Sequence, residues 1–212
     1  MQTPNHDKGD RPAIRLTTRS GFLVSALGCG VLLGLLNSLS NLFGSPYSPA
    51  SLAPGVGVFA LEVLAAVLGT PGAWAATAFI AGTFAHRLWA GPVGGVAALL
   101  VADVTYYLSD SINGYAALSW DEVLFWAALA VPTGLVMGQL GVLASQPFWW
   151  SILPGLAGPA ALVVLARPSG SDHIQPWPMQ ATLVAAGLLL TFAITRWLWQ
   201  MRRTRPIPTT GR

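Results

Sequence analysis

The chain has 212 residues, of which 53% are hydrophobic and only 9% are charged, and its mean hydropathy is +0.58. Soluble domains carry about 25% charged residues, and a compact chain of this length cannot hide so much apolar surface from water. The composition therefore excludes an ordinary soluble domain and indicates one bundle of helices covered by lipid. The formal net charge is +3, but the basic residues form no aromatic-interleaved patch that would suit a nucleic-acid partner.

The first apolar segment follows a polar stretch. Residues 1–20 are expected to form a cytoplasmic tail and not a signal peptide, because the apolar run 21–43 is too long for an h-region and lacks a clear small-residue cleavage site. We interpret that run as the first transmembrane helix. Ala26, Gly30 and Gly34 recur every four residues along it, a spacing that makes a flat face for close helix contact. Packing inside the chain is the expected use of this face, and a homo-oligomer formed through it is the alternative.

The next apolar segment is shorter than a membrane span. A turn-rich run at 45–49 precedes it, and the apolar stretch itself covers only residues 56–69 before a Gly-Thr-Pro-Gly sequence at 69–72. A spanning helix needs about 20 apolar residues. We therefore expect a re-entrant or interfacial half-helix at 56–69, with a seventh, short span as the alternative.

The rest of the chain predicts five further spans and a basic cytoplasmic tail at 201–212. The membrane domain as a whole is expected to cover 21–200. The five spans are expected at about 72–88, 92–109, 123–143, 148–166 and 179–200.

Charge supports six spans plus one half-helix. With the N-terminus inside, the outer side holds only Arg167, which is a clear positive-inside asymmetry. A seventh span before Gly72 would move Arg87 outside and separate the two termini. The ten basic residues on the inner side are then Lys8, Arg11, Arg15, Arg19, Arg87, Arg196, Arg202, Arg203, Arg205 and Arg212.

The residues that commonly bind metals are sparse and scattered. Cys29 is the only cysteine, which excludes an internal disulfide and a cysteine-based metal cluster. The three histidines, His6, His86 and His173, have no ligand partner at the helical spacings that zinc or haem sites use. The chain also contains no Gly-rich phosphate loop and no Asp-rich diphosphate-magnesium motif. We therefore expect neither a metal nor another cofactor.

The acidic residues are the most informative feature for function. An ionisable group within the bilayer costs about 3 kcal/mol on insertion scales and is usually retained for a function or paired. Glu62 lies in the middle of the short half-helix, and Asp103 lies in the outer half of the third span, so both are candidate functional residues. Asp110 is expected to be solvated at a helix end. Asp121 and Glu122 are expected to be charges at a helix N-terminus, where the dipole favours anions.

A buried carboxyl group suits one type of chemistry. In an apolar pocket such a group favours its protonated form and can donate a proton to a neutral olefin or epoxide. The cation that results is stabilised by aromatic faces, although aromatic residues at this depth can equally be interfacial anchors. We therefore predict Glu62 and Asp103 as catalytic acids. The predicted substrate-binding residues are Tyr106, Tyr107, Asp110, Trp120, Phe125 and Trp126.

Several short stretches resemble a family of small actinobacterial membrane proteins, mostly of unknown function. The resemblance covers about residues 25–145, and the stretches are 30–37 (GVLLGLLN), 71–74 (PGAW), 91–93 (GPV) leading to Ala102-Asp103, 125–126 (FW) and 134–138 (GLVMG). Size, topology and intramembrane acids also resemble the bacterial membrane-bound terpene cyclases of the drimentine and xiamycin type. That resemblance implies an isoprenoid substrate, protonation by a carboxylic acid without a metal, and Glu62 before Asp103 as the candidate acid.

Two other classes of function remain open. Six-helix substrate-capture subunits of vitamin transporters resemble the chain in length and helix number. That alternative predicts an outward-open polar pocket, with an energising partner at the face of Ala26, Gly30 and Gly34. The other alternative is a structural or assembly protein without a small-molecule site, which would leave Glu62 and Asp103 unexplained unless they are paired.

Overall fold

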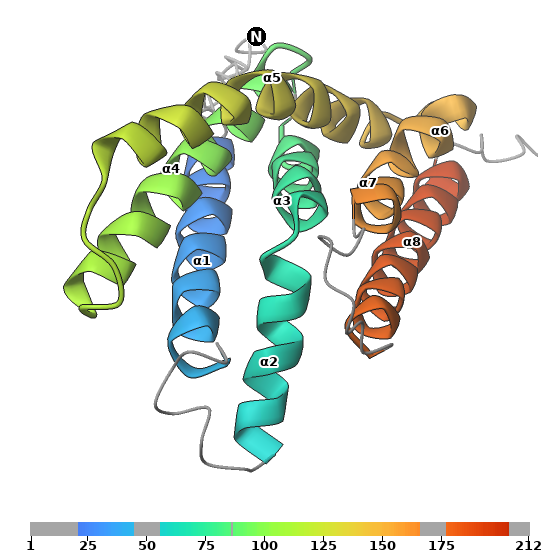
Figure 1. Ribbon diagram of the computed structural model, residues 1–212. Coiled ribbons are helices and arrows are strands. Elements are labelled where there is room, and N and C mark those ends of the chain that lie inside the picture. The colour runs from blue at the N-terminus through green and yellow to red at the C-terminus, as the bar shows by residue number, and fades with distance from the viewer. Residues whose placement is uncertain (1–20, 45–55, 86, 166–176, 204–212) are drawn as a thin grey trace, which may run out of the picture.

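The computed structural model describes residues 21–44, 56–85, 87–165 and 177–203, and within these ranges every regular element is helical (Figure 1). The predicted tail 1–20, the turn-rich run 45–49 and residues 204–212 lie outside the described residues, whereas 201–203 continue the last helix. In chain order the helices are α1 (Gly21–Gly44), α2 (Val56–Leu68), α3 (Pro71–Thr83), α4 (Ala90–Ile112), α5 (Trp120–Ala144), the 3-10 helix η3 (Trp149–Ser151), α6 (Ile152–Gly155), α7 (Ala157–Leu165) and α8 (Trp177–Arg203).

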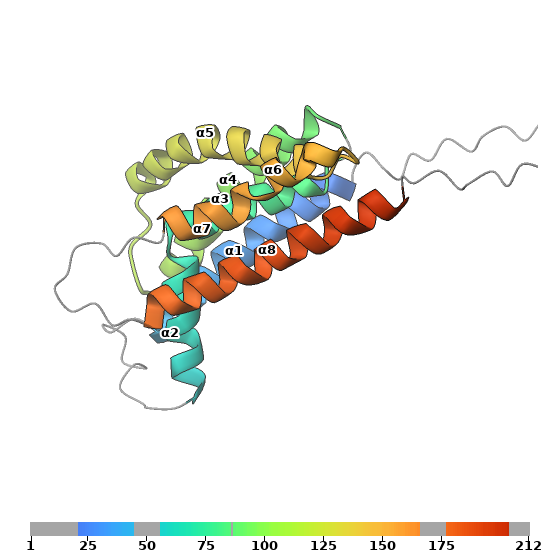
Figure 2. The same ribbon diagram turned by 90° about the vertical axis from the view of Figure 1, so that its right-hand side faces the viewer.

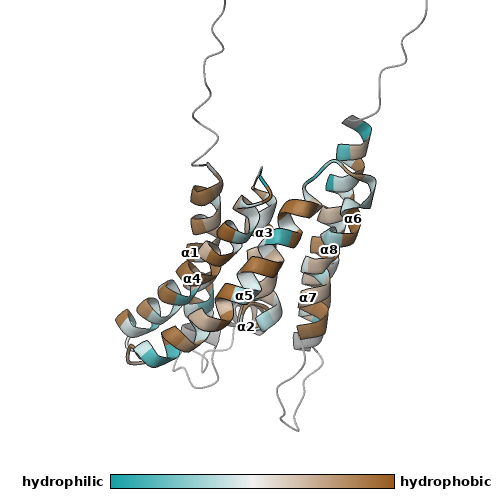
Figure 3. Cartoon of the chain, turned by 90° about the horizontal axis from the view of Figure 1, so that it is seen from above, coloured by the Kyte–Doolittle hydropathy of each residue, from teal (hydrophilic) through white to brown (hydrophobic). Residues whose placement is uncertain are grey.

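Among the described residues, four helices are long and apolar enough to cross a bilayer. The crossing segments are Gly21–Ser40 of α1, Ala90–Ile112 of α4, Trp120–Ala144 of α5 and Gln180–Arg202 of α8. Apolar residues prevail along the helices (Figure 3), and many large ones lie on the outside of the bundle. The prediction of an all-α fold with membrane-length helices is therefore confirmed, and the fold is consistent with a membrane location.

Two predicted spans form shorter helices than expected. The predicted span 72–88 ends as a helix at Thr83, and the predicted span 148–166 is divided into η3, α6 and α7. Pro154 and Pro159 lie within this second segment and cannot donate backbone hydrogen bonds, which favours short pieces over one continuous helix. Six spans with a re-entrant half-helix therefore stay a prediction.

The predicted half-helix leads directly into α3 across a break at Gly69 and Thr70. Thr70 is extended (φ −84°, ψ 144°), as a residue before proline prefers, and its hydroxyl oxygen accepts a hydrogen bond from the backbone N–H of Ala73 at 3.2 Å. Pro71 then occupies the first turn of α3, where its missing N–H costs nothing. In Figure 1 α2 lies below α3, and the two short helices form one element that is interrupted at this break.

Close contact between α1 and α4 uses the small-residue face of α1. A Cβ atom added to Gly34 would lie 2.5 Å from the carbonyl oxygen of Ala102, and one added to Gly30 would collide with the backbone of Ala98. Ala26 is fully buried, in a cluster that includes Ala98. The face therefore packs within the chain, and a homo-oligomer through α1 stays a prediction.

Glycines also bring α4 and α5 together. A Cβ atom on Gly91 would lie 2.6 Å from the carbonyl oxygen of Gly138, and Gly95 packs against Gly134 in the same way. The beginning of α1 and the end of α8 lie at one end of the bundle, and the connection from α4 to α5 lies toward the other (Figure 2). This helix arrangement leaves a space between α1, α4, α5 and the α2–α3 break.

Candidate intramembrane ligand site

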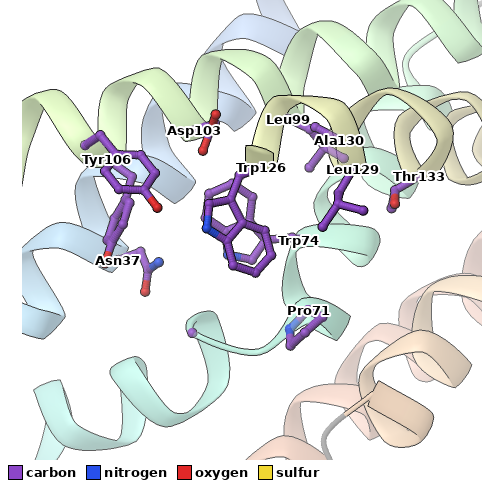
Figure 4. A pocket seen from close by; sticks show the side chains of 12 residues that line it. Asn37, Pro71, Trp74, Leu99, Asp103, Tyr106, Trp126, Leu129, Ala130 and Thr133 are labelled. Carbon is purple, nitrogen blue, oxygen red and sulfur yellow. The ribbon is translucent and has the colours of Figure 1, made fainter. Parts of the chain in front are cut away.

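A cavity of about 540 Å³ occupies this space (Figure 4). Its volume lies within the range of about 300–1,000 Å³ that is typical of small-molecule sites. Four separate elements contribute to its wall, so no single segment of the sequence defines it. The described residues that line it are Asn37, Gly69, Pro71, Trp74, Leu99, Asp103, Tyr106, Tyr107, Trp126, Leu129, Ala130 and Thr133.

Asp103 is the one carboxylic acid among these lining residues. Its side chain is 1% exposed, and neither carboxylate oxygen has a hydrogen-bond partner within the described ranges. Figure 4 shows the carboxyl group directed toward the cavity from α4. A buried polar group without a partner is costly and rare in native proteins, so this acid is the strongest indication of a functional site.

Aromatic rings form much of the cavity wall around Asp103. The ring centroids of Trp74 and Tyr106 are 6.4 Å apart, and those of Tyr106 and Tyr107 are 5.1 Å apart, both in edge-to-face geometry. Trp126 of α5 also lines the cavity. Three of these four rings, those of Tyr106, Tyr107 and Trp126, belong to the predicted substrate-binding residues.

Asp110, two turns after Asp103, is in a different situation. It is 3% exposed and accepts a hydrogen bond from the Ser38 hydroxyl of α1. The Tyr106 hydroxyl, one turn earlier, is also hydrogen-bonded to this carboxyl group. The expectation that Asp110 is solvated at a helix end is therefore wrong, because α1 packs along α4 and covers it. Asp110, a predicted substrate-binding residue, is not among the described residues that line the cavity. It is hydrogen-bonded to Tyr106, which does line it.

The outcome differs for the other predicted site residues, Trp120, Phe125 and Glu62. Trp120 and Phe125 are 62% and 59% exposed on α5, and neither is among the described lining residues. Their exposure is typical of anchors in an apolar environment. Glu62 belongs to α2, but its side chain lies outside the described part of the chain. Glu122 lies in the exposed first turn of α5, as predicted, and its backbone N–H donates to the capping hydroxyl of Ser119.

Sequence reasoning missed two of the most informative wall residues. Trp74 follows the helix-starting Pro71 by three positions, so its ring projects beside the α2–α3 break. Asn37 is 5% exposed, and its side-chain oxygen has no hydrogen-bond partner in the described residues. The available signal for Asn37 was an amide directly after an apolar run, because polar side chains of membrane helices commonly hydrogen-bond across helices.

The described cavity wall contains one acid and several aromatic rings. Among the described residues, no group of three or more histidine, cysteine, aspartate or glutamate side chains could hold a metal ion. One acid surrounded by aromatic rings can protonate a neutral ligand or bind a cationic one, because the ring faces attract positive charge in either case.

Comparison of the chain with protein-family models, with curated proteins and with solved structures finds no match. A function therefore has to be inferred from the chemistry of the cavity.

Proposed function

We propose that the chain is a membrane-embedded, metal-independent terpene cyclase in which Asp103 is the proton donor. One observation carries the proposal: a fully buried carboxyl group, without a hydrogen-bond partner in the described residues, lines a cavity with aromatic walls. An olefin or an epoxide is a weak base, so its protonation requires an acid that is shielded from water and held close by. Glu62 on α2 remains a second candidate acid.

The proposed reaction is an isomerisation. Asp103 donates its proton to a terminal olefin carbon or epoxide oxygen of a prenyl chain, and a cation forms. The π electrons of a neighbouring double bond attack the cation, which converts one π bond into a new carbon–carbon σ bond at each ring closure. The last cation loses a proton to the Asp103 carboxylate, which restores the acid. Trp74, Tyr106 and Trp126 stabilise the positive charge.

Access from the lipid suits such a substrate. Trp126 and Leu129 line the cavity, and both are 46% exposed. In the proposal, a prenyl chain dissolved in the bilayer enters the cavity beside these two side chains.

A six-span topology accompanies the proposal, with both termini in the cytoplasm. In it, α2 is the re-entrant or interfacial half-helix, α3 belongs to the second crossing, and η3, α6 and α7 belong to the fifth. This assignment leaves Arg87 and Arg202 on the same side of the membrane as the termini, in agreement with the positive-inside rule.

An assay on membranes tests the cyclase directly. The chain is expressed in a bacterium that lacks isoprenoid natural products, and its membranes are incubated with farnesyl-indole and with the terminal epoxide of that compound. Chromatography with mass spectrometry should detect a product of unchanged mass and new retention time. Asp103→Asn should abolish this product, and Glu62→Gln tests the second candidate acid.

Asp121→Asn is the matched control, because the Asp121 carboxyl group is exposed in the first turn of α5. This variant should keep full turnover. Unconverted substrates in the presence of folded wild-type protein would exclude a cyclase for these substrates, and equal loss in both aspartate variants would show that the effect is not specific to Asp103.

A second candidate function is substrate capture or transport. The observation that favours it is the α2–α3 break, because Gly69 and Pro71 at this break line the cavity. Interrupted helices at a membrane-embedded binding site are typical of transporters, where freed backbone groups bind the ligand. Reversible retention of a ligand by purified protein, with no chemical conversion, would support this function over the cyclase.

A further inference from the structure

Three polar residues, Asn37, Ser38 and Ser40, are buried near the end of α1. The Ser38 hydroxyl donates to Asp110, and the Ser40 hydroxyl donates to the backbone carbonyl of Asn37 at 2.8 Å. Both hydroxyl groups are therefore paired inside the protein. The side-chain oxygen of Asn37 is the exception, since it has no hydrogen-bond partner in the described part of the chain.

The unpaired oxygen belongs to a residue that lines the cavity. Figure 4 shows the Asn37 side chain directed toward the cavity, from a different helix than Asp103. Gly69 of the α2–α3 break lies near it, because a Cβ atom added at Gly69 would lie 4.0 Å from this oxygen. A buried amide oxygen without a partner costs stability, so its place in the wall of a mostly apolar cavity indicates a ligand group that completes its hydrogen bonding.

We propose that Asn37 is a specificity-determining residue that accepts a hydrogen bond from a hydroxyl or amino group of the substrate. The inference rests on the proposed function, since it takes the cavity as the substrate site, and it adds the substrate class. The substrate is an isoprenoid with two different ends: an olefin or epoxide at Asp103 and an O–H or N–H donor at Asn37. A pure hydrocarbon or an ether leaves the Asn37 oxygen unpaired and binds more weakly.

Binding of two closely matched ligands tests this assignment without requiring turnover. Farnesol and farnesyl methyl ether share the same chain, but only farnesol can donate a hydrogen bond. Their affinities are measured on purified protein in lipid nanodiscs by the change in tryptophan fluorescence, since Trp74 and Trp126 line the cavity. Wild-type protein should bind farnesol about threefold to tenfold more tightly than the ether, as one net hydrogen bond implies.

Variants separate the role of Asn37 from general packing. Asn37→Leu has a similar volume and no acceptor, so it should bind both ligands with equal affinity. Asn37→Asp keeps an acceptor oxygen and should keep the preference for farnesol. Leu39→Ala, at an exposed position of the same helix, is the control and should behave as wild type.

Equal affinity of wild-type protein for the two ligands would overturn the inference, as would a preference that survives in Asn37→Leu or no binding of either ligand. The binding assay tests the role of Asn37, and the membrane assay tests the cyclase. If the alcohol preference depends on Asn37 but the membrane assay yields no cyclised product, the recognition of a donor group stands and the cyclase does not. If Asp103-dependent cyclisation occurs without an alcohol preference, the cyclase stands and the recognition of a donor group by Asn37 does not.

Discussion

Ser38 of α1 donates a hydrogen bond to Asp110 of α4, a residue 72 positions further along the chain. Both side chains are buried, with exposed fractions of 1% and 3%, so this hydrogen bond joins two membrane-length helices in a region that excludes water. It also explains why two acids on one face of α4 differ: Asp110 is paired, whereas Asp103, two turns earlier, lines the cavity.

The Ser38–Asp110 hydrogen bond should contribute measurably to stability. Ser38→Ala leaves a buried carboxyl group without its α1 partner and should destabilise the protein by about 1–3 kcal/mol. Chemical unfolding in detergent micelles, followed by circular dichroism, measures the change. Ser25→Ala serves as the control, because the Ser25 hydroxyl donates to the Gly21 carbonyl of its own helix. Equal stability of the two variants would contradict a role for the interhelical bond.

Replacement of Asp103 should raise stability, whereas replacement of Ser38 should lower it. Because its buried oxygens have no partner in the described residues, Asp103→Leu removes an unpaired polar group, and we expect a gain of about 1–3 kcal/mol in stability. The same variant should lose all ligand turnover, which is the trade-off expected when a protein retains a costly group for function. A thermal unfolding midpoint at or below that of wild type would refute this prediction, whereas Asp110→Leu should be destabilised.

Gly34 and Gly28 both lie on α1, but only Gly34 is closely approached by another helix. Gly34→Ala places a methyl group 2.5 Å from the Ala102 carbonyl oxygen, and we expect a loss of about 1–3 kcal/mol from the overpacked α1–α4 contact. At Gly28 nothing lies within 4 Å, so Gly28→Ala should stabilise the helix by about 0.5–1 kcal/mol through its higher helix propensity. Unfolding curves of both variants under identical conditions give the two changes, and a similar effect of both would argue against close packing at Gly34.

Arg196 should hold α8 against the rest of the bundle. Its guanidinium group donates to the Thr83 carbonyl at 3.3 Å and to the Ser145 hydroxyl at 3.1 Å, which joins α8 to α3 and α5. Arg196→Ala should therefore speed up the proteolytic release of α8 and lower stability by about 1–3 kcal/mol. Arg202→Ala, at an exposed position of the same helix, should change neither. Unchanged proteolysis of Arg196→Ala would show that other contacts are sufficient.

The candidate site was partly predictable from the sequence. Asp103 stood out because a carboxyl group within an apolar run is costly wherever that run folds, and the neighbouring Tyr106 and Tyr107 share its helix. Trp74 and Asn37 were missed because each lies in a segment whose position relative to Asp103 depends on helix packing. The expected solvation of Asp110 was wrong for the same reason, since Ser38 is remote in sequence.

The sequence alone determined the class of the protein. A chain with 53% hydrophobic and 9% charged residues, gathered in long apolar runs, predicts helices that are compatible with lipid, because a helix satisfies its backbone polar groups within its own segment. Only the tertiary structure decided which buried polar groups are paired. Glycine contacts set the distances between α1, α4 and α5, and these distances leave Asp110 within reach of Ser38 but leave Asp103 and Asn37 facing a cavity. Such pairings depend on long-range packing, which residue type and spacing along one helix do not specify.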